Sequence, residues 1–296
     1  MIFAAIDIGS NAGRLLFSNV TEIKGAPKAE KASLIRIPLR LGFDVFKDGF
    51  ISKEKEEDLI NTLKAFKLLI DVYKPISYKA CATSAMRDAL NSREIIARIK
   101  REVGLDLEVI DGMEEAKLIT ANNEAFFNEK IPYMMFVDVG GGSTEISLLH
   151  NNQLVDYQSF NIGTIRLLNN GVSKEEWSKM EQWLNQYKSL YRKLHLVGSG
   201  GNINKIKKLY GDENDGFVTF DRIMKAYKQL KKISVEERIS SLNLRPDRAD
   251  VIVPATEIFL SIQKVINVEK IFIPRIGLTD GIVYSLYHNQ YEVVNG

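Results

Sequence analysis

Cysteine is nearly absent from this chain of 296 residues, which contains only Cys81. A single cysteine excludes a disulfide framework and any zinc site built from several cysteines. The three histidines, His150, His195 and His288, are scattered and lack the spacing of a metal-binding motif. We therefore expect neither a disulfide nor a zinc centre.

A strong charge of one sign and a long apolar run are also missing. Lys and Arg number 40 against 38 Asp and Glu, a formal net charge of +2, which excludes a dominant nucleic-acid-binding charge but not a local basic groove. The longest apolar runs have the length of strands and fall short of the ~20 residues that span a membrane. Residues 1–7 lack the basic region of a signal peptide. We expect a cytoplasmic protein whose partners include neither nucleic acid nor a membrane.

The length and an internal repeat together predict two related domains. A chain of this length exceeds the ~150 residues of one ordinary domain. An apolar strand that ends in Asp7 continues as Ile8-Gly9-Ser10-Asn11, and a second that ends in Asp138 continues as Val139-Gly140-Gly141-Gly142-Ser143-Thr144. In both copies a second apolar strand follows the turn, and 131 residues separate the two aspartates. Two such hairpins at half-chain spacing indicate a duplicated domain.

Each half shows three consecutive strand patterns followed by alternating helices and strands, which predicts an α/β fold with mixed sheets. Strands are predicted at residues 2–8, 14–20, 34–39, 78–82, 107–110, 134–139, 144–150, 153–160, 193–198 and 270–273. Helices are predicted near residues 53–72, 92–103, 174–191, 202–210, 220–230, 247–265 and 280–287.

We place the domains at residues 1–124 and 125–296, with the connection near residues 122–132, where the periodicity breaks. Whether a C-terminal helix of about residues 281–296 packs back on the first domain stays open. The cleft between the two halves is the expected ligand site.

The two glycine-rich turns have the composition of phosphate-binding loops. Successive backbone N–H groups in such a turn form an anion-binding nest, and glycine allows close approach of the backbone. The first turn, Gly9-Ser10-Asn11, adds side-chain donors and the cation Arg14; the second contains Gly140, Gly141, Gly142, Ser143 and Thr144. No Gly-Lys-Ser/Thr follows, so neither is a Walker A motif, and the strand after each turn excludes a dinucleotide-binding fingerprint.

Two carboxylates flank the second glycine turn. Asp138 ends the strand before it and Glu145 lies at the start of the strand after it. A hairpin brings such positions together, and two carboxylates beside a phosphate nest suit Mg²⁺ or the positioning of water. Ordinary turn chemistry is the alternative for a strand-end aspartate.

A third acidic position opens a predicted helix at Asp111-Gly112-Met113-Glu114-Glu115. Asp111 and Glu114 match an acidic variant of the capping box, which accounts for Glu114 without any catalytic role. Glu115 is not needed for capping and could deprotonate an attacking water. A solvated first-turn glutamate, favoured by the helix dipole, is the equally compatible alternative.

Two further candidate phosphate-binding segments each follow a predicted apolar strand. Thr83 and Ser84 can donate hydrogen bonds to a phosphate, and Arg87 can bind one with two parallel bonds, although a capped helix with a surface arginine explains them as well. The turn 198–202, with Gly200 and Gly201, leads into a helix and suits phosphate approaching the backbone. The lysines after it, at 205, 207 and 208, form either a solvated helix face or an extension of a polyanion groove.

Taken together, these motifs resemble the exopolyphosphatase/guanosine-pentaphosphate phosphatase family, which shares the fold superfamily of actin and the sugar kinases. The resemblance covers nearly the whole chain. It rests on residues 3–14, 82–91, 109–119, 136–148, 161–167, 198–203, 248–254 and 277–281. Asn202 and Thr279-Asp280 depart from the family pattern.

The resemblance implies two ribonuclease-H-like domains and metal-dependent hydrolysis of a terminal phosphoanhydride. By similarity, Glu115 is the general base, and Asp138 and Glu145 bind Mg²⁺ or another divalent cation or position water. Arg87 belongs to the implied phosphate clamp and is predicted as a second catalytic residue. The implied phosphate clamp also includes Asp7, Ser10, Asn11, Gly141, Gly142, Ser143 and Thr144. The residue patterns described above add Gly9, Arg14, Thr83, Ser84, Gly140, Gly200 and Gly201 to the predicted phosphate-binding residues.

Several functions stay open at this stage. The favoured one is release of terminal orthophosphate from inorganic polyphosphate, and the first alternative is the 5′-phosphohydrolysis of guanosine pentaphosphate. A kinase of the same superfamily and a non-catalytic sensor of polyphosphate or guanosine tetra- or pentaphosphate are alternatives of other classes. The expected partner is polyphosphate or a phosphorylated guanine nucleotide, and a homodimer is not excluded.

Overall fold

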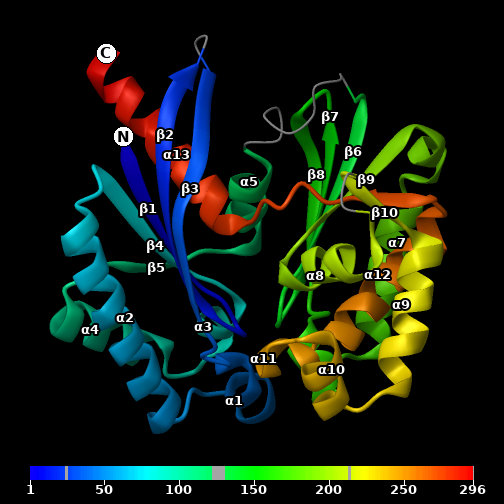
Figure 1. Cartoon of the computed structure of the whole chain (residues 1–296), viewed down its shortest axis with the longest axis horizontal. Helices are drawn as coiled ribbons and strands as arrows, with labels where there is room; N and C mark the ends of the chain where they lie inside the picture. The colour runs from blue at the N-terminus through cyan, green and yellow to red at the C-terminus, as the bar shows by residue number, and fades with distance from the viewer. Residues whose placement is uncertain (24–25, 122–130, 213–214, 296) are drawn as a thin grey trace. The chain divides into compact units, whose positions relative to one another are not determined.

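The computed structural model describes residues 1–23, 26–121, 131–212 and 215–295. It divides into two compact units, the first made of Met1–Ala125 with Gly277–Gly296 and the second of Phe126–Ile276. Both termini therefore belong to the first unit (Figure 1). The predicted connection near residues 122–132 lies almost entirely outside the described residues, as does the boundary between 124 and 125, and both stay predictions.

The first unit contains a five-stranded mixed sheet in the order β3-β2-β1-β4-β5. Its strands are β1 (Ile2–Ile8), β2 (Gly13–Ile23), β3 (Ala26–Ile37), β4 (Ser77–Ala82) and β5 (Leu107–Val109). Its helices are α1 (Leu41–Asp48), α2 (Lys53–Tyr73), α3 (Ser84–Asp88), α4 (Ser92–Val103), α5 (Gly112–Thr120) and α13 (Leu278–Asn295).

Helices cover both faces of this sheet. Successive side chains of a strand point to opposite faces, so β1 contributes to two cores. Ile6 and Ile8 pack in a cluster with residues of α2 and α4, whereas Phe3 and Ala5 pack with residues of α5 and α13. The C-terminal helix α13 thus lies on β1 beside α5 (Figure 1).

The second unit contains a six-stranded mixed sheet in the order β10-β11-β9-β6-β7-β8. Its strands are β6 (Tyr133–Val139), β7 (Thr144–His150), β8 (Gln153–Phe160), β9 (Leu194–Ser199), β10 (Phe217–Thr219) and β11 (Lys270–Phe272). Its helices are α6 (Thr164–Leu168), α7 (Lys174–Asn185), α8 (Gly201–Tyr210), α9 (Phe220–Lys232), α10 (Val235–Leu242), α11 (Pro246–Ala249) and α12 (Ile252–Ile266), with a 3-10 helix at Lys188–Lys193.

The two sheets repeat one topology, which confirms the predicted α/β fold with two mixed sheets. Starting from β8, the order β8-β7-β6-β9-β11 reproduces β3-β2-β1-β4-β5. In both sheets the first strand is antiparallel to the second and parallel to the fourth. Strand β10 is an addition, antiparallel to β11 at the edge of the second sheet. Across the described ranges, no helix combines the length and apolarity that crossing a membrane requires.

Several predicted elements differ from the structure. The helix predicted over 174–191 ends at Asn185 and gives way to the 3-10 helix. The helix predicted over 247–265 is two helices: Pro246 opens α11, and Pro254 lies in the first turn of α12, where the missing N–H of proline costs no helical bond. The sequence prediction missed α1, α3, α6, α10 and β10. These elements have three to eight residues, too few for a periodic pattern to be recognised.

Candidate active site

The first glycine loop connects β1 to β2 and is anchored by its carbonyl groups. The N–H of Gly9 donates to the carbonyl of Ala12 at 3.1 Å, which closes the turn. The carbonyls of Ser10 and Asn11 accept hydrogen bonds from backbone N–H groups at the start of α1, at 2.8 and 3.0 Å. A trans peptide directs its C=O and N–H in opposite directions, and none of the described peptide bonds is cis. The N–H groups of Asn11 and Ala12 therefore point away from α1, as an anion site requires.

Asp7 and Arg14 face each other across β1 and β2 beside this loop. The two residues are register partners, and the Arg14 guanidinium forms an ion pair with the buried Asp7 carboxylate. The pairing neutralises the aspartate, so this carboxylate does not repel an anion bound at the loop.

The turn between β4 and α3 lies against the first glycine loop. Strands β1 and β4 are parallel neighbours, so their carboxyl ends reach the same edge of the sheet. The Ser10 and Ser84 hydroxyls form a buried hydrogen bond of 2.8 Å, and the Thr83 N–H donates to the Ile8 carbonyl at 3.1 Å. Two segments that the sequence singled out separately are thus brought together.

Arg87 connects α3 to the beginning of α5. Its Nη1 donates to the carbonyl of Ile110 at 3.1 Å, at the carboxyl end of β5. Ile110 directly precedes Asp111, which caps α5. The guanidinium therefore supports the segment from which α5 begins.

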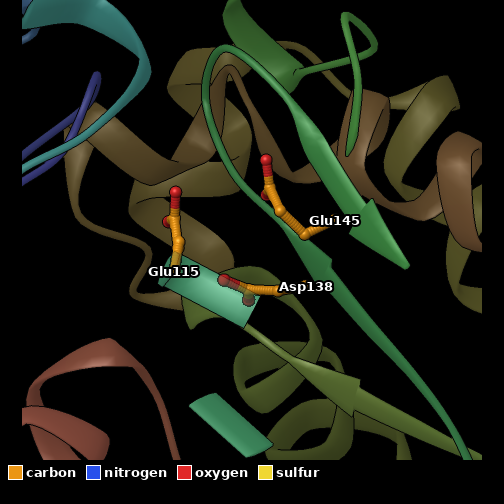
Figure 2. A group of neighbouring side chains, drawn as sticks. All are labelled: Glu115, Asp138 and Glu145. Carbon is orange, nitrogen blue, oxygen red and sulfur yellow. The ribbon is translucent and has the colours of Figure 1, made fainter. Parts of the chain in front are cut away.

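The first turn of α5 contains two adjacent glutamates, Glu114 and Glu115, of which Glu114 forms a structural ion pair. As predicted, Asp111 is the N-cap, and its side chain accepts from the Glu114 N–H at 2.8 Å. The Glu114 carboxylate forms an ion pair with Lys79 at 3.1 Å. Glu114 is thus used in the structure of the first unit, whereas Glu115 is the next residue along the same helix (Figure 2).

The second glycine loop, residues 140–143 between β6 and β7, repeats the design of the first. The N–H of Gly140 donates to the Ser143 carbonyl at 3.0 Å. The carbonyls of Gly140, Gly141 and Gly142 accept from the Thr164 N–H, the Ile165 N–H and the Arg166 Nε, at 3.0, 2.8 and 2.7 Å.

These three anchored carbonyls fix the direction of the adjoining N–H groups. Because the peptides are trans, the N–H groups of Gly141, Gly142 and Ser143 point away from α6. Three successive N–H groups aimed to one side are the geometry of a phosphate nest.

Gly163 allows α6 to approach this loop. A Cβ atom at this position would lie 2.3 Å from the Gly141 carbonyl oxygen and 2.4 Å from the Gly142 carbonyl carbon. No side chain fits there, because the obstructing atoms belong to the backbone of the loop. Thr144, the first residue of β7, donates its hydroxyl to the Ile162 carbonyl and fixes the same segment.

Asp138 and Glu145 are register partners on β6 and β7, directly beside the second loop. One carboxylate oxygen of each lies within 4.8 Å of the other. Glu145 is buried, and the Ser159 hydroxyl of β8 donates to its Oε1 at 2.9 Å. Figure 2 shows both side chains at this end of the two strands. Two close carboxylates, one of them oriented by a hydroxyl, form an oxygen donor set of the kind that binds Mg²⁺.

The third glycine turn lies against Asp138. Gly200 has φ +104°, and a Cβ there would lie 3.3 Å from Asp138 Oδ1 and 3.1 Å from the Val139 carbonyl oxygen. A Cβ on Gly201, the first residue of α8, would lie 2.8 Å from Nη2 of Arg248. This turn therefore reaches both the carboxylate pair and an arginine.

The residues that support the loops were not predicted as site residues. They are Ser159, Thr164, Arg166 and Arg248. Three of them act on backbone or carboxylate groups far away in the sequence, and no local pattern reveals such contacts. A signal existed for Thr164, Arg166 and Arg248, because residues 161–167 and 248–254 belong to the motifs that carry the family resemblance.

The two mixed sheets share one strand topology, with a glycine loop after the first strand of each, and define a two-sheet α/β protein with the fold of solved Ppx/GppA structures. A family model described as the Ppx/GppA phosphatase family matches residues 33–290, and the chain belongs to this family. Its members are phosphatases that hydrolyse phosphoanhydride bonds.

Individual relatives agree with this assignment. The chain is 24% identical over 300 residues to a Haemophilus influenzae protein named as an exopolyphosphatase, covering 97% of this chain and 91% of that one. It is 22% identical over 304 residues to the guanosine-5′-triphosphate,3′-diphosphate pyrophosphatase of Aeromonas salmonicida, covering 98% of this chain and 60% of that one. The crystal structure of the Aquifex aeolicus member of the Ppx/GppA family has 28% identity and a TM-score of 0.76, with 98% of both chains covered.

Proposed function

We propose that this phosphatase releases terminal orthophosphate from inorganic polyphosphate. The observation that carries the proposal is the second glycine loop, whose anchored carbonyls leave three N–H groups directed to one side, next to two carboxylates. The similarity to the Haemophilus influenzae exopolyphosphatase extends over nearly the full length of both chains and supports this substrate.

In the proposed mechanism the backbone binds the phosphates and Glu115 activates water. The N–H groups of the loops at 9–12 and 140–143 neutralise phosphate oxygens, as phosphoryl transfer requires. Glu115 accepts a proton from water, and the resulting hydroxide attacks the terminal phosphorus. The bond to the bridging oxygen breaks, so that orthophosphate leaves and the chain is shortened by one unit. Arg87 holds the segment in front of α5 and assists in charge neutralisation.

Asp138 and Glu145 are the proposed ligands of a divalent cation. The donor set fits Mg²⁺, since both residues offer carboxylate oxygens and Ser159 orients one of them. A bound Mg²⁺ would neutralise negative charge on the phosphates. The remaining proposed phosphate contacts come from Ser10, Thr83, Ser84 and the glycine turn at 200–201.

Guanosine pentaphosphate is the second candidate substrate. The Aeromonas salmonicida relative is named for this reaction, and a terminal phosphoanhydride is present in both substrates. The same loops and carboxylates would serve either compound, because they address phosphate rather than a base.

A side-by-side assay distinguishes the candidates. Orthophosphate release is measured with Mg²⁺ from tripolyphosphate, long-chain polyphosphate and guanosine pentaphosphate. The proposal expects the highest kcat/KM on a polyphosphate. Turnover confined to guanosine pentaphosphate would replace the first candidate by the second, and tight binding of any of the three without turnover would identify a sensor.

A further inference from the structure

The second glycine loop has a charged support, Arg166, which lies in the last turn of α6. Its Nε donates to the Gly142 carbonyl at 2.7 Å, and its backbone N–H lies 3.4 Å from the Gly141 carbonyl oxygen. The carbonyls before Gly142 are held by neutral backbone N–H groups, those of Thr164 and Ile165. A hydrogen bond from an ionised donor is shorter and roughly twice as strong as a neutral one. The Gly142 carbonyl is therefore held more strongly than its neighbours.

This hydrogen bond also acts on the opposite end of the same peptide group. The Gly142 C=O and the Ser143 N–H share one peptide unit, whose partial double bond keeps them coplanar and directed in opposite ways. A cation at the oxygen draws electrons from the nitrogen, because hydrogen bonds in a chain polarise one another. Arg166 thus fixes the direction of the Ser143 N–H and makes it a stronger donor to an anion.

The Ser143 N–H lies at the end of the loop that adjoins the carboxylate pair. Ser143 directly precedes β7, in which Glu145 is the second residue and the register partner of Asp138. The Gly140 N–H donates to the Ser143 carbonyl at 3.0 Å and closes the loop at this residue. A phosphate that accepts from the Ser143 N–H is therefore the one next to the proposed metal ligands.

Arg166 is itself attracted by a carboxylate in the first turn of α7. Glu176 accepts from Lys179 at 2.7 Å and from the Asn161 N–H at 3.1 Å. The Lys179 hydrogen bond lowers the pKa of Glu176 most, against the effect of burial, and the Asn161 N–H and the charge of Arg166 lower it further. The ionised carboxylate thus connects α7 to the segment that supports the loop.

The other supports of the loop do not depend on the Arg166 side chain. The N–H groups of Thr164 and Ile165 belong to the backbone, as does the Arg166 carbonyl, which accepts from the Gly171 N–H at 2.8 Å. Truncation of Arg166 leaves these bonds in place and removes only the charged contact to Gly142. Its effect on the reaction can therefore be separated from an effect on folding.

We propose that Arg166 is a positioning residue of the phosphatase reaction. Through the Gly142–Ser143 peptide group it orients and polarises the N–H that binds the phosphate next to Asp138 and Glu145. This inference rests on the proposed function for the place of that phosphate, but it does not depend on the remainder of the substrate. Negative charge is redistributed over the phosphate oxygens in the transition state, so a stronger donor lowers the barrier more than it tightens substrate binding.

The test removes the guanidinium and then supplies it in solution. Arg166→Ala leaves space for a guanidinium ion, and Arg166→Lys keeps a charge without the planar fork. Arg192→Ala, at an exposed position of the 3-10 helix in the same unit, is the matched control. Values of kcat and KM are measured with Mg²⁺ on tripolyphosphate, long-chain polyphosphate and guanosine pentaphosphate. Each assay is run in guanidinium chloride, below concentrations that unfold the protein, and in sodium chloride of equal ionic strength.

We expect Arg166→Ala to lower kcat about tenfold on every substrate that wild type hydrolyses, with a rise in KM of less than about threefold. Guanidinium should restore most of this kcat, sodium chloride should not, and neither salt should change Arg192→Ala relative to wild type. Arg166→Lys should fall between Arg166→Ala and wild type. A wild-type kcat in Arg166→Ala would overturn the proposal. So would a lowered kcat that guanidinium does not restore, because a free ion does not repair a structural defect.

A binding measurement separates this proposal from the proposed function. Calorimetry without added Mg²⁺ gives the affinity of wild type and Arg166→Ala for tripolyphosphate. If wild type releases orthophosphate from none of the three substrates, the proposed function fails. An affinity of Arg166→Ala about two- to threefold below wild type, restored by guanidinium, would still support the role of Arg166 at the loop. Equal affinities of the two proteins in that case would overturn it. Circular dichroism of each variant confirms folding.

Discussion

The hydroxyls of Ser10 and Ser84 form a buried hydrogen bond of 2.8 Å, although 74 residues separate them. It joins the loop after β1 to the turn after β4 and so connects two proposed phosphate-binding segments. A buried hydroxyl that loses its partner keeps the cost of its desolvation.

We therefore expect Ser84→Ala and Ser10→Ala each to lower the free energy of unfolding by about 1–3 kcal/mol. The double variant Ser10→Ala/Ser84→Ala should lose less than the sum of the two, because neither side then leaves a hydroxyl unsatisfied. Urea unfolding of the four proteins measures the coupling. Additive losses would show that the hydrogen bond contributes no coupling.

Gly281 controls how closely α13 approaches α5, the helix of Glu115. A Cβ at Gly281 would lie 1.8 Å from the Leu118 carbonyl oxygen of α5, a contact that only movement of backbone can relieve. We expect Gly281→Ala to cost about 1–3 kcal/mol of stability and to lower kcat, since α5 must shift. Gly171→Ala is the control, as its Cβ would lie an ordinary 3.5 Å from the nearest carbonyl. Thermal unfolding and phosphate release are the two measurements. A melting temperature and a kcat of Gly281→Ala equal to those of wild type would contradict this account.

Cys81 lies in β4 with no exposed surface, in the core that contains α13. Burial raises the pKa of its thiol to about 12, so the thiol is protonated in the folded protein at about pH 8. We expect a thiol reagent to leave native Cys81 unlabelled and to label it rapidly in denaturant.

The same raised pKa has a consequence for stability in alkali. The unfolded thiol ionises near its usual value of 9.0, below the folded value, so the unfolded state binds fewer protons in between. This contribution to stability is complete below about pH 9 and is lost as the pH rises towards 12. The Cys81→Ala variant should lack this pH-dependent contribution to stability. The same dependence of unfolding on pH between 9 and 12 in wild type and Cys81→Ala would disprove the raised pKa of Cys81.

Removal of either proposed metal ligand should change the Mg²⁺ requirement rather than the fold. Asp138→Asn and Glu145→Gln each retain the shape of the side chain but lose its charge. We expect the Mg²⁺ concentration for half-maximal activity to rise about tenfold or more. Asp221→Asn, on the exposed side of α9, is the matched control. An unchanged Mg²⁺ titration of both ligand variants would exclude these residues as ligands.

Much of the fold could be predicted from the sequence because it depends on local patterns. The strands at 2–8, 144–150 and 153–160 and the helix at 92–103 have the predicted bounds, since alternation or a helical stripe extends over enough residues. The repeat of Asp and glycines correctly indicated two sheets of one topology. The short helices α1, α3 and α6 carry too few residues for such a pattern, although α1 and α6 anchor the glycine loops.

The site was predictable only in part for a related reason. Glycine turns and strand-end carboxylates are visible as local residue types, and their neighbours on the next strand follow from the hairpin. The direction of the loop N–H groups cannot be recognised in the sequence. It is set by hydrogen bonds from backbone N–H groups at the start of α1 and α6 to the loop carbonyls. The role of Asp280 could not be predicted from the sequence either. This residue departs from the family motif, but in the structure its carboxylate accepts a hydrogen bond from the Gly277 N–H at 3.0 Å and forms an ion pair with Lys31 at 2.8 Å.

The most direct test of the central claim compares Glu115→Gln with Glu114→Gln, the same change at adjacent positions of α5. Glu114 forms an ion pair with Lys79 in the first unit, so removing the Glu114 charge should leave orthophosphate release from polyphosphate nearly intact. Glu115→Gln removes the proposed base and should lower kcat by about 10²-fold or more while polyphosphate binding persists. Comparable turnover of Glu115→Gln and wild type, with Mg²⁺ present, would contradict the account.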